Sequence, residues 1–342
     1  MGLFSTIIGF ARQGAGNAAL PSRIDAGRPA PRQRTLALAL AFPALLFGAP
    51  SAAGETARPW LDGRHADYHL LWQDTVPAER LAEPFTRETF DAAGWRVSTW
   101  NDDLNERFGK FAKAPDGTPA IEVRFPTMSY WRDGGIEIQT DHFAGKDSTD
   151  SVVYAYELML EINPSDYTVE ENRSGIISGK LAGLYSDNRD LGRIPAKQKG
   201  WVTREVWRGR RGDPAPRVGS YDYHLNRTDE PEEITYGVAI GDDAVVEPIR
   251  WVKIAREVVF NDPGVPNGKS RMWVDGKLVA DRDDLIYLQG PEYPLRGMRF
   301  HTFCGGSHPW LVNEDWRIWF RNFQLWVPAV AENPENAAST AP

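Results

Sequence analysis

The sequence has a single cysteine, Cys304, among 342 residues, so the chain cannot form an internal disulfide. Its stability must therefore come from a packed core, which a chain of this length is able to bury. Long apolar runs are also lacking, since the run at residues 36–47 has only twelve residues and a membrane-spanning helix needs about 20. No long segment repeats apolar residues at helical spacing. These absences exclude a disulfide-stabilised scaffold and argue against a helical fold.

The apolar run at residues 36–47 has the flanks of a secretory signal. Arg32 and Arg34 precede it, and the small residues Ser-Ala-Ala at 51–53 follow it. This order is typical of a signal sequence with its cleavage site. We expect cleavage near Ala53 and export of the mature chain to the periplasm or the medium, with no membrane attachment afterwards. A retained membrane anchor is the alternative.

Net positive charge is lacking as well. The formal net charge is −8, and loss of the expected signal peptide, residues 1–53, removes five arginines and one aspartate and leaves −12. Such acidity disfavours binding to nucleic acid or to anionic membranes. An acidic ligand would therefore need a local patch of positive charge.

One segment reverses this charge balance. Between Arg173 and Arg217, eleven Lys or Arg residues stand against four Asp or Glu, and Tyr185, Trp201 and Trp207 lie among them. Arginine pairs with carboxylates through two N–H groups, and aromatic faces stack on sugar rings. The combination favours an acidic polysaccharide as partner, and a solvated basic loop without a ligand is the plainer alternative.

Alternation of apolar and polar residues recurs along the chain. It predicts strands at residues 120–125, 152–162, 201–207, 271–274, 298–303 and 316–326. Asp275-Gly276 lies between two strand-like runs and predicts a tight hairpin. Helical turns are expected only within residues 76–93.

Many short strands without alternating helices predict an all-β fold. We expect a two-sheet antiparallel sandwich, a β-jelly roll or a concanavalin-like relative. Residues 54–327 would form one domain, because neither an internal repeat nor an interdomain linker is present. Residues 328–342 are rich in Ala, Pro, Asn and Glu and are predicted to be a disordered tail.

Strand alternation also assigns side chains to faces. On residues 201–207 it places Arg204 with Val202 and Val206, opposite the face that carries Trp201, Thr203, Glu205 and Trp207. Tyr221 and Tyr223 are two residues apart, so their phenol rings should project side by side. Half-buried packing tyrosines are the alternative interpretation of this pair.

Several motifs, in order, resemble one family. They are GKLAGL (179–184), WVTREVW (201–207), YDY (221–223), NDPGVPNGKSRMWVDGKLV (261–279), RFHTFCGGS (299–307) and WRIWFRNFQLW (316–326). Together they resemble the family-14 polysaccharide lyases, which include alginate and glucuronan lyases. The resemblance implies a β-jelly roll whose concave sheet binds a polyuronate and cleaves it by β-elimination without a cofactor.

β-Elimination needs three kinds of group. A cation neutralises the uronate carboxylate, a base removes the C5 proton, and an acid protonates the departing glycosidic oxygen. By motif position, the resemblance implies that Lys180 is the catalytic base or the carboxylate neutraliser and that Arg204 clamps the substrate. Tyr221 or Tyr223 would be the proton donor, and the roles of lysine and tyrosine could be exchanged. A lysine base must be desolvated or placed among other cations.

The sequence departs from the family pattern at two places. Val202 stands where the family often has serine, and Lys197 and Lys199 occupy a region where a histidine is expected. The residues that we expect to bind substrate are Arg124, Lys197, Lys199, Trp201, His224, Arg299 and His301. No metal site and no cofactor are predicted, because a solvated turn is favoured over calcium for Asp281, Asp283 and Asp284. A monomer is expected.

Two other functions stay open. A glycoside hydrolase needs a pair of carboxylates at a defined separation. Glu157 and Glu161 share a strand face, but four residues span about 13 Å, which is too far for either hydrolytic mechanism. A non-catalytic carbohydrate-binding module would use the same aromatic residues without a base. Loss of turnover in Lys180→Ala distinguishes an enzyme from such a module.

Overall fold

The computed structural model describes residues 68–129, 133–143, 149–168, 175–186, 200–227, 237–289, 294–305 and 312–329. The expected signal peptide lies outside these ranges, and export therefore stays a prediction. Residues 330–342 of the expected tail also lie outside them, as do Lys197 and Lys199.

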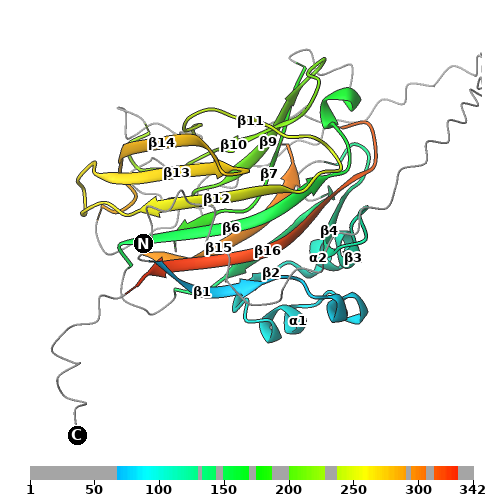
Figure 1. Ribbon diagram of the computed structural model, residues 1–342, viewed down its shortest axis with the longest axis horizontal. Coiled ribbons are helices and arrows are strands. Elements are labelled where there is room, and N and C mark those ends of the chain that lie inside the picture. The colour runs from blue at the N-terminus through cyan, green and yellow to red at the C-terminus, as the bar shows by residue number, and fades with distance from the viewer. Residues whose placement is uncertain are drawn as a thin grey trace, which may run out of the picture. The chain divides into compact units, whose positions relative to one another are not determined.

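The described strands form two antiparallel sheets, each of eight strands (Figure 1). Sheet I has the order β14-β13-β12-β6-β16-β4-β3, with β1 also paired to β16. Its strands are β1 (Tyr68–Asp74), β3 (Gly109–Lys113), β4 (Pro119–Phe125), β6 (Ser151–Leu160), β12 (Val252–Val259), β13 (Gly268–Val274), β14 (Lys277–Leu285) and β16 (Trp316–Pro328).

Sheet II has the order β11-β10-β9-β7-β15-β5-β2, with β8 also paired to β15. Its strands are β2 (Val97–Trp100), β5 (Ile136–Thr140), β7 (Ile176–Lys180), β8 (Leu184–Ser186), β9 (Glu205–Arg210), β10 (Arg217–Ser220), β11 (Ala244–Val245) and β15 (Leu295–Cys304). The all-β, two-sheet antiparallel prediction is confirmed.

A single large hydrophobic core joins the inner faces of the two sheets. Tyr154 and Leu158 of β6 point into it from sheet I, and Ile177, Trp207 and Phe300 point into it from sheet II. Because alternate residues of a strand face opposite sides, the neighbours of these core residues lie on the outer faces. The core therefore fixes which side chains sheet II presents outward.

Four short helices accompany the sheets in the described part of the chain. The η1 (Ala78–Ala82) and α1 (Arg87–Ala92) helices lie where helical turns are predicted. The α2 (Asp102–Phe108) and η3 (Pro164–Tyr167) helices are not predicted, since a helix this short gives little periodic signal. None of the described helices is long and apolar enough to cross a membrane.

Two predictions about strand ends are sharpened. Asp275 and Gly276 join β13 to β14 with φ values of 49° and 77°, the left-handed pair that a two-residue hairpin turn needs. The strand predicted at 201–207 begins only at Glu205, and Val202 makes isolated bridges to Tyr185 and Tyr223 instead.

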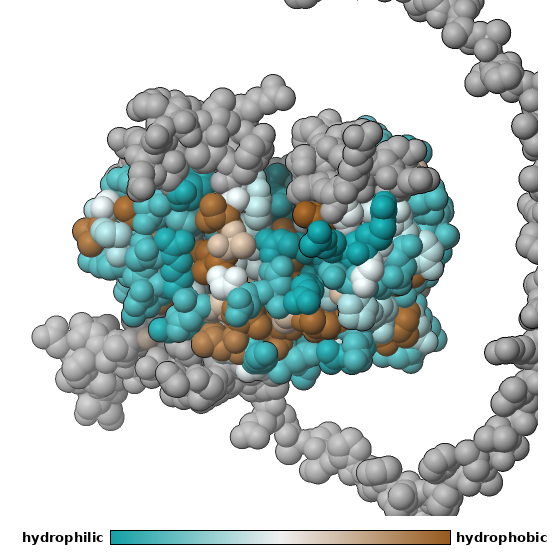
Figure 2. All heavy atoms as spheres, turned by 90° about the horizontal axis from the view of Figure 1, so that it is seen from above, coloured by the Kyte–Doolittle hydropathy of each residue, from teal (hydrophilic) through white to brown (hydrophobic). Residues whose placement is uncertain are grey.

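On the face shown in Figure 2, hydrophobic residues form small groups separated by hydrophilic ones.

Candidate active site

Two glycines set the backbone around Lys180. A Cβ atom at Gly179 would lie 2.2 Å from Nε1 of Trp207, and one at Gly183 would lie 1.8 Å from the carbonyl oxygen of Thr203. Only glycine allows β9 and the segment before it to approach so closely. Since Ile177 and Trp207 pack in the core, Lys180 lies on the outer face of sheet II.

Backbone pairing brings the two tyrosines to Lys180. The N–H of Tyr221 donates to the carbonyl of Arg204 at 2.7 Å, and the N–H of Tyr223 donates to the carbonyl of Val202 at 2.8 Å. Lys180 Nζ lies 3.3 Å from the centroid of the Tyr221 ring. The Tyr221 ring meets the Tyr223 ring edge to face, with centroids 5.5 Å apart. Lys180, Arg204, Tyr221 and Tyr223 therefore form one group, the Lys180 cluster.

Burial shifts the pKa values of Lys180, Arg204 and Tyr221 in this cluster. Lys180 is 8% exposed, and burial, followed by the charges of Arg204 and Arg208, holds its pKa well below the usual value. Burial and then Tyr223 raise the pKa of Tyr221 well above that of a free phenol. Burial and then Arg299 lower the pKa of Arg204, yet a guanidinium stays charged near neutrality. The cluster can thus hold a neutral amine, a protonated phenol and a fixed cation.

A second polar group lies on the same face, in β15 and β5. Arg299 Nη2 is 3.2 Å from His301 Nδ1 and 3.5 Å from Glu137 Oε1. Arg299 and His301 share the predicted parity, and their binding of substrate stays a prediction. Sequence reasoning missed Glu137, although the alternation of Ile136 and Ile138 around it was the available signal.

Three predicted substrate-binding residues are corrected. Trp201 is fully buried in the core, where its ring centroid lies 5.2 Å from that of Phe260. His224 is fully buried and pairs through Nδ1 with Asn226 Oδ1 at 2.8 Å; burial lowers its pKa to about 4. Both residues occupy inward-facing positions of their segments, which explains why their side chains are buried. Arg124 lies in sheet I, where it forms an ion pair with Asp315 at 2.8 Å.

The carboxylates considered for other functions are paired with arginines. Glu157 binds Arg321 at 2.7 Å in sheet I, and Glu161 binds Arg317 at 2.7 Å. Neither glutamate therefore contributes to the outer face of sheet II. Among the described residues, no group of three or more His, Cys, Asp or Glu is arranged to hold a metal ion.

The two packed antiparallel sheets define a β-sandwich protein, and the family match gives its class, the polysaccharide lyases. The family model Polysaccharide lyase 14 matches residues 113–323, more than half of the sequence. The chain belongs to this family, and the resemblance drawn from its motifs is confirmed.

Solved structures share the fold at low sequence identity. The marine PL-14 alginate lyase from Aplysia kurodai is 20% identical, with a TM-score of 0.56 over 76% of this chain and 100% of that one. Alginate lyase vAL-1 from Chlorella virus is 17% identical, with a TM-score of 0.54 over 76% and 100%. A mutant of alginate lyase Aly36B in complex with alginate tetrasaccharide is 16% identical, with a TM-score of 0.55 over 71% and 91%. Comparison with curated proteins finds no significant match.

Proposed function

We propose that this polysaccharide lyase cleaves a polyuronate of the alginate or glucuronan type by β-elimination at the Lys180 cluster. The observation that carries the proposal is the contact of a buried lysine with a half-buried tyrosine, at 3.3 Å, beside Arg204. Alginate lyases among the solved structures of the same fold support this substrate class.

Arg204 supplies the fixed positive charge. The C5 proton of a uronate becomes removable when the neighbouring carboxylate is neutralised and the developing enolate-like charge is stabilised. The guanidinium of Arg204, on the outward-facing side of its segment, would take this role, and the charges of Arg208 and Arg299 reach the same region. These cations let an acidic protein bind a polyanion at one place.

Lys180 is the base and Tyr221 the acid in this proposal. A base must be unprotonated before the reaction, and the lowered pKa of Lys180 favours its neutral amine near neutrality. An acid must be protonated, and the raised pKa of Tyr221 keeps its phenol so. Tyr221 is preferred over Tyr223 because the Tyr221 ring is the one in contact with Lys180.

The test uses a panel of polymannuronate, polyguluronate and glucuronan. We expect the protein to produce unsaturated products, detected by their ultraviolet absorbance, and Lys180→Ala to lose turnover by about 100-fold or more. The matched control is Lys277→Ala, which removes an exposed lysine from sheet I and should keep full activity.

Three outcomes would decide against the proposal. Full activity in Lys180→Ala would refute the role of that lysine. New reducing ends without unsaturation would indicate a hydrolase instead. Binding of polyuronate without any product would indicate a carbohydrate-binding module.

A further inference from the structure

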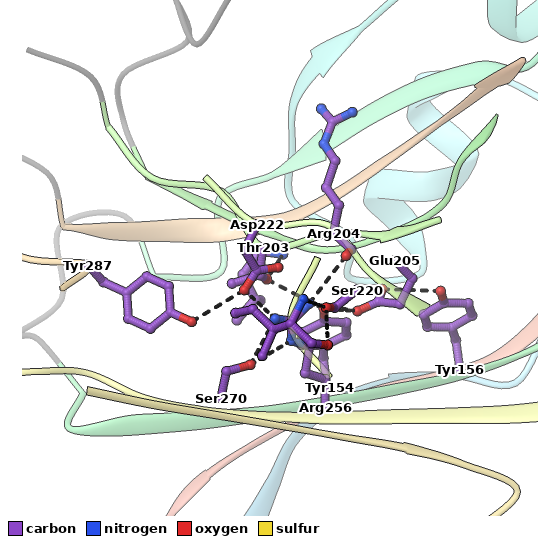
Figure 3. Close-up of polar contacts among 12 residues, drawn as sticks. Tyr154, Tyr156, Thr203, Arg204, Glu205, Ser220, Asp222, Arg256, Ser270 and Tyr287 are labelled. Carbon is purple, nitrogen blue, oxygen red and sulfur yellow. Dashed lines mark hydrogen bonds and ion pairs between the residues drawn. The ribbon is translucent and has the colours of Figure 1, made fainter. Parts of the chain in front are cut away.

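A group of charged side chains lies buried between the two sheets, on the core side of Arg204 (Figure 3). It comprises Arg256 of β12 in sheet I, Glu205 of β9 and Asp222, and the side chains of all three are fully buried. We propose that Arg256 is a positioning residue of the lyase, which holds the backbone of Arg204 and Tyr221 in place from the core side. This inference rests on the proposed function.

Arg256 binds the backbone of the active site itself. Its Nη1 donates to the carbonyl oxygen of Arg204 at 3.2 Å, and the same oxygen accepts the N–H of Tyr221 at 2.7 Å. In Figure 3 the Arg204 side chain points away from the buried group while its carbonyl faces Arg256. One guanidinium thus bonds the same carbonyl oxygen that links the backbone of the substrate clamp, Arg204, to the backbone of the proposed acid, Tyr221.

The remaining donors of Arg256 fix its own position. Nη2 donates to Asp222 Oδ2 in a short ion pair and to Ser270 Oγ at 2.8 Å, and Nε donates to Ser270 Oγ at 3.1 Å. Nη1 also lies 3.5 Å from Glu205 Oε1. The planar guanidinium makes these bonds in a fixed geometry, which a lysine cannot reproduce.

Strand alternation couples this buried group to the outer face. Glu205 directly follows Arg204 in the chain, and Asp222 lies between Tyr221 and Tyr223. Each outward residue of the Lys180 cluster on these two segments therefore has an inward neighbour that touches Arg256. A displacement of Arg256 would move the clamp and both tyrosines together.

Stability alone does not account for the buried charges. Removing two carboxylates and a guanidinium from water opposes folding, and well-packed neutral residues in such places are often as stable or more stable. Tyrosine hydroxyls supply further bonds, from Tyr156 to Glu205 at 3.2 Å and from Tyr287 to Asp222 at 3.5 Å. Because this network lies on the core side of the Lys180 cluster, it serves to hold the backbone of that cluster in position.

The test is a charge-free version of the network. Arg256→Met alone would leave two buried carboxylates without their partner, so it is combined with Glu205→Gln and Asp222→Asn in the full chain. We expect a folded protein whose kcat falls by about 100-fold while its KM changes much less, since a small displacement of reacting groups has this effect on rate. A loss of folded protein would also lower the apparent kcat without changing KM, so kcat is given per folded molecule, with the folded fraction measured by circular dichroism at the assay temperature.

A second buried ion pair gives the matched control. Arg80 and Asp74 form an ion pair with side chains 4% and 3% exposed. Arg80 also bonds Glu83 and Thr89 and lies over the rings of Phe90 and Phe111, none of which belongs to the Lys180 cluster. Arg80→Met with Asp74→Asn should therefore keep kcat within about twofold. An equal loss of kcat in this control would overturn the inference.

The conservative variant Arg256→Lys covers the case in which the triple variant does not fold. It keeps the charge but cannot bond Arg204, Asp222 and Ser270 at once, so we expect a reduced kcat with a nearly unchanged KM. Wild-type kcat in a folded triple variant or in Arg256→Lys would overturn the inference while leaving the proposed function standing. Absence of turnover in the wild-type protein would instead overturn the proposed function, and the positioning role with it.

Discussion

In the proposed function, burial and then its two arginine neighbours suit Lys180 to the role of base. Arg204 and Arg208 add positive charge that disfavours the ammonium form. A lysine base acts as the neutral amine, so kcat/KM should rise with pH through the lowered pKa of Lys180. Arg208→Gln removes one charge and raises the pKa of Lys180, because the ammonium is then less disfavoured. The acidic limb of the kcat/KM profile should move to higher pH.

The control for this prediction is Arg208→Lys, which keeps the positive charge and should leave the acidic limb in place. Arg208 also forms an ion pair with Asp243, and the lysine variant can retain a charge partner for that carboxylate. An acidic limb that does not move in Arg208→Gln would argue that another group is the base.

At the scale of the element, β7 depends on close packing against β9. A methyl group at position 179 would meet the ring of Trp207, a fully buried core side chain. Gly179→Ala should therefore lower the free energy of unfolding by about 1–3 kcal/mol, as overpacking commonly does. Urea unfolding at fixed pH measures this loss. Activity should fall with it, because Lys180 follows directly.

Trp207→Phe supplies the second side of a double-mutant cycle. The smaller ring leaves room for the methyl group, so the double variant should be more stable than the sum of the two single effects. Strict additivity would show that the cost of Gly179→Ala does not come from Trp207.

The elements also show what the sequence alone can predict. The alternation predicts β6 and β16, but β5 and β12, with five and eight residues, were missed, and β8 and β11 have three residues and two residues and give too short a signal. The inward and outward parity of Arg204 and Trp201 was predictable even though this segment is not a regular strand. The basic neighbours of Trp201 nevertheless predict that it binds substrate, whereas its side chain packs in the core.

Contacts between sheets were beyond the reach of sequence patterns. Arg256 lies in β12 with the ordinary appearance of a charged strand residue. Its partners are Glu205 in sheet II and Asp222 in the segment after β10, which are 51 and 34 residues away in the chain. Alternation identifies the inward face of each strand. It does not identify which inward residues of two sheets meet.

At the scale of the whole molecule, ionisable groups sealed between the sheets make stability depend on pH. Burial raises the pKa of Glu205 from 4.5 to about 7, so the folded protein holds this proton more tightly than the unfolded chain does. The contribution to stability is complete below pH 4.5 and is lost as pH rises through about 7. Its size is on the order of 3 kcal/mol for a fully buried group.

We therefore expect the Glu205 contribution to the free energy of unfolding to fall from about pH 5 to about pH 8, against the opposite contribution of His224, whose pKa is lowered to about 4. Glu205→Gln keeps the shape of the side chain without the ionisation, so its slope over this range should be smaller, and the variant should be the more stable protein at the alkaline end. Glu247→Gln is the control, because the Glu247 side chain is 75% exposed and should leave the slope unchanged. Urea unfolding at several pH values measures all three proteins. Equal slopes in Glu205→Gln and the wild type would mean that Glu205 is ionised in the folded state across this range, held so by Arg256.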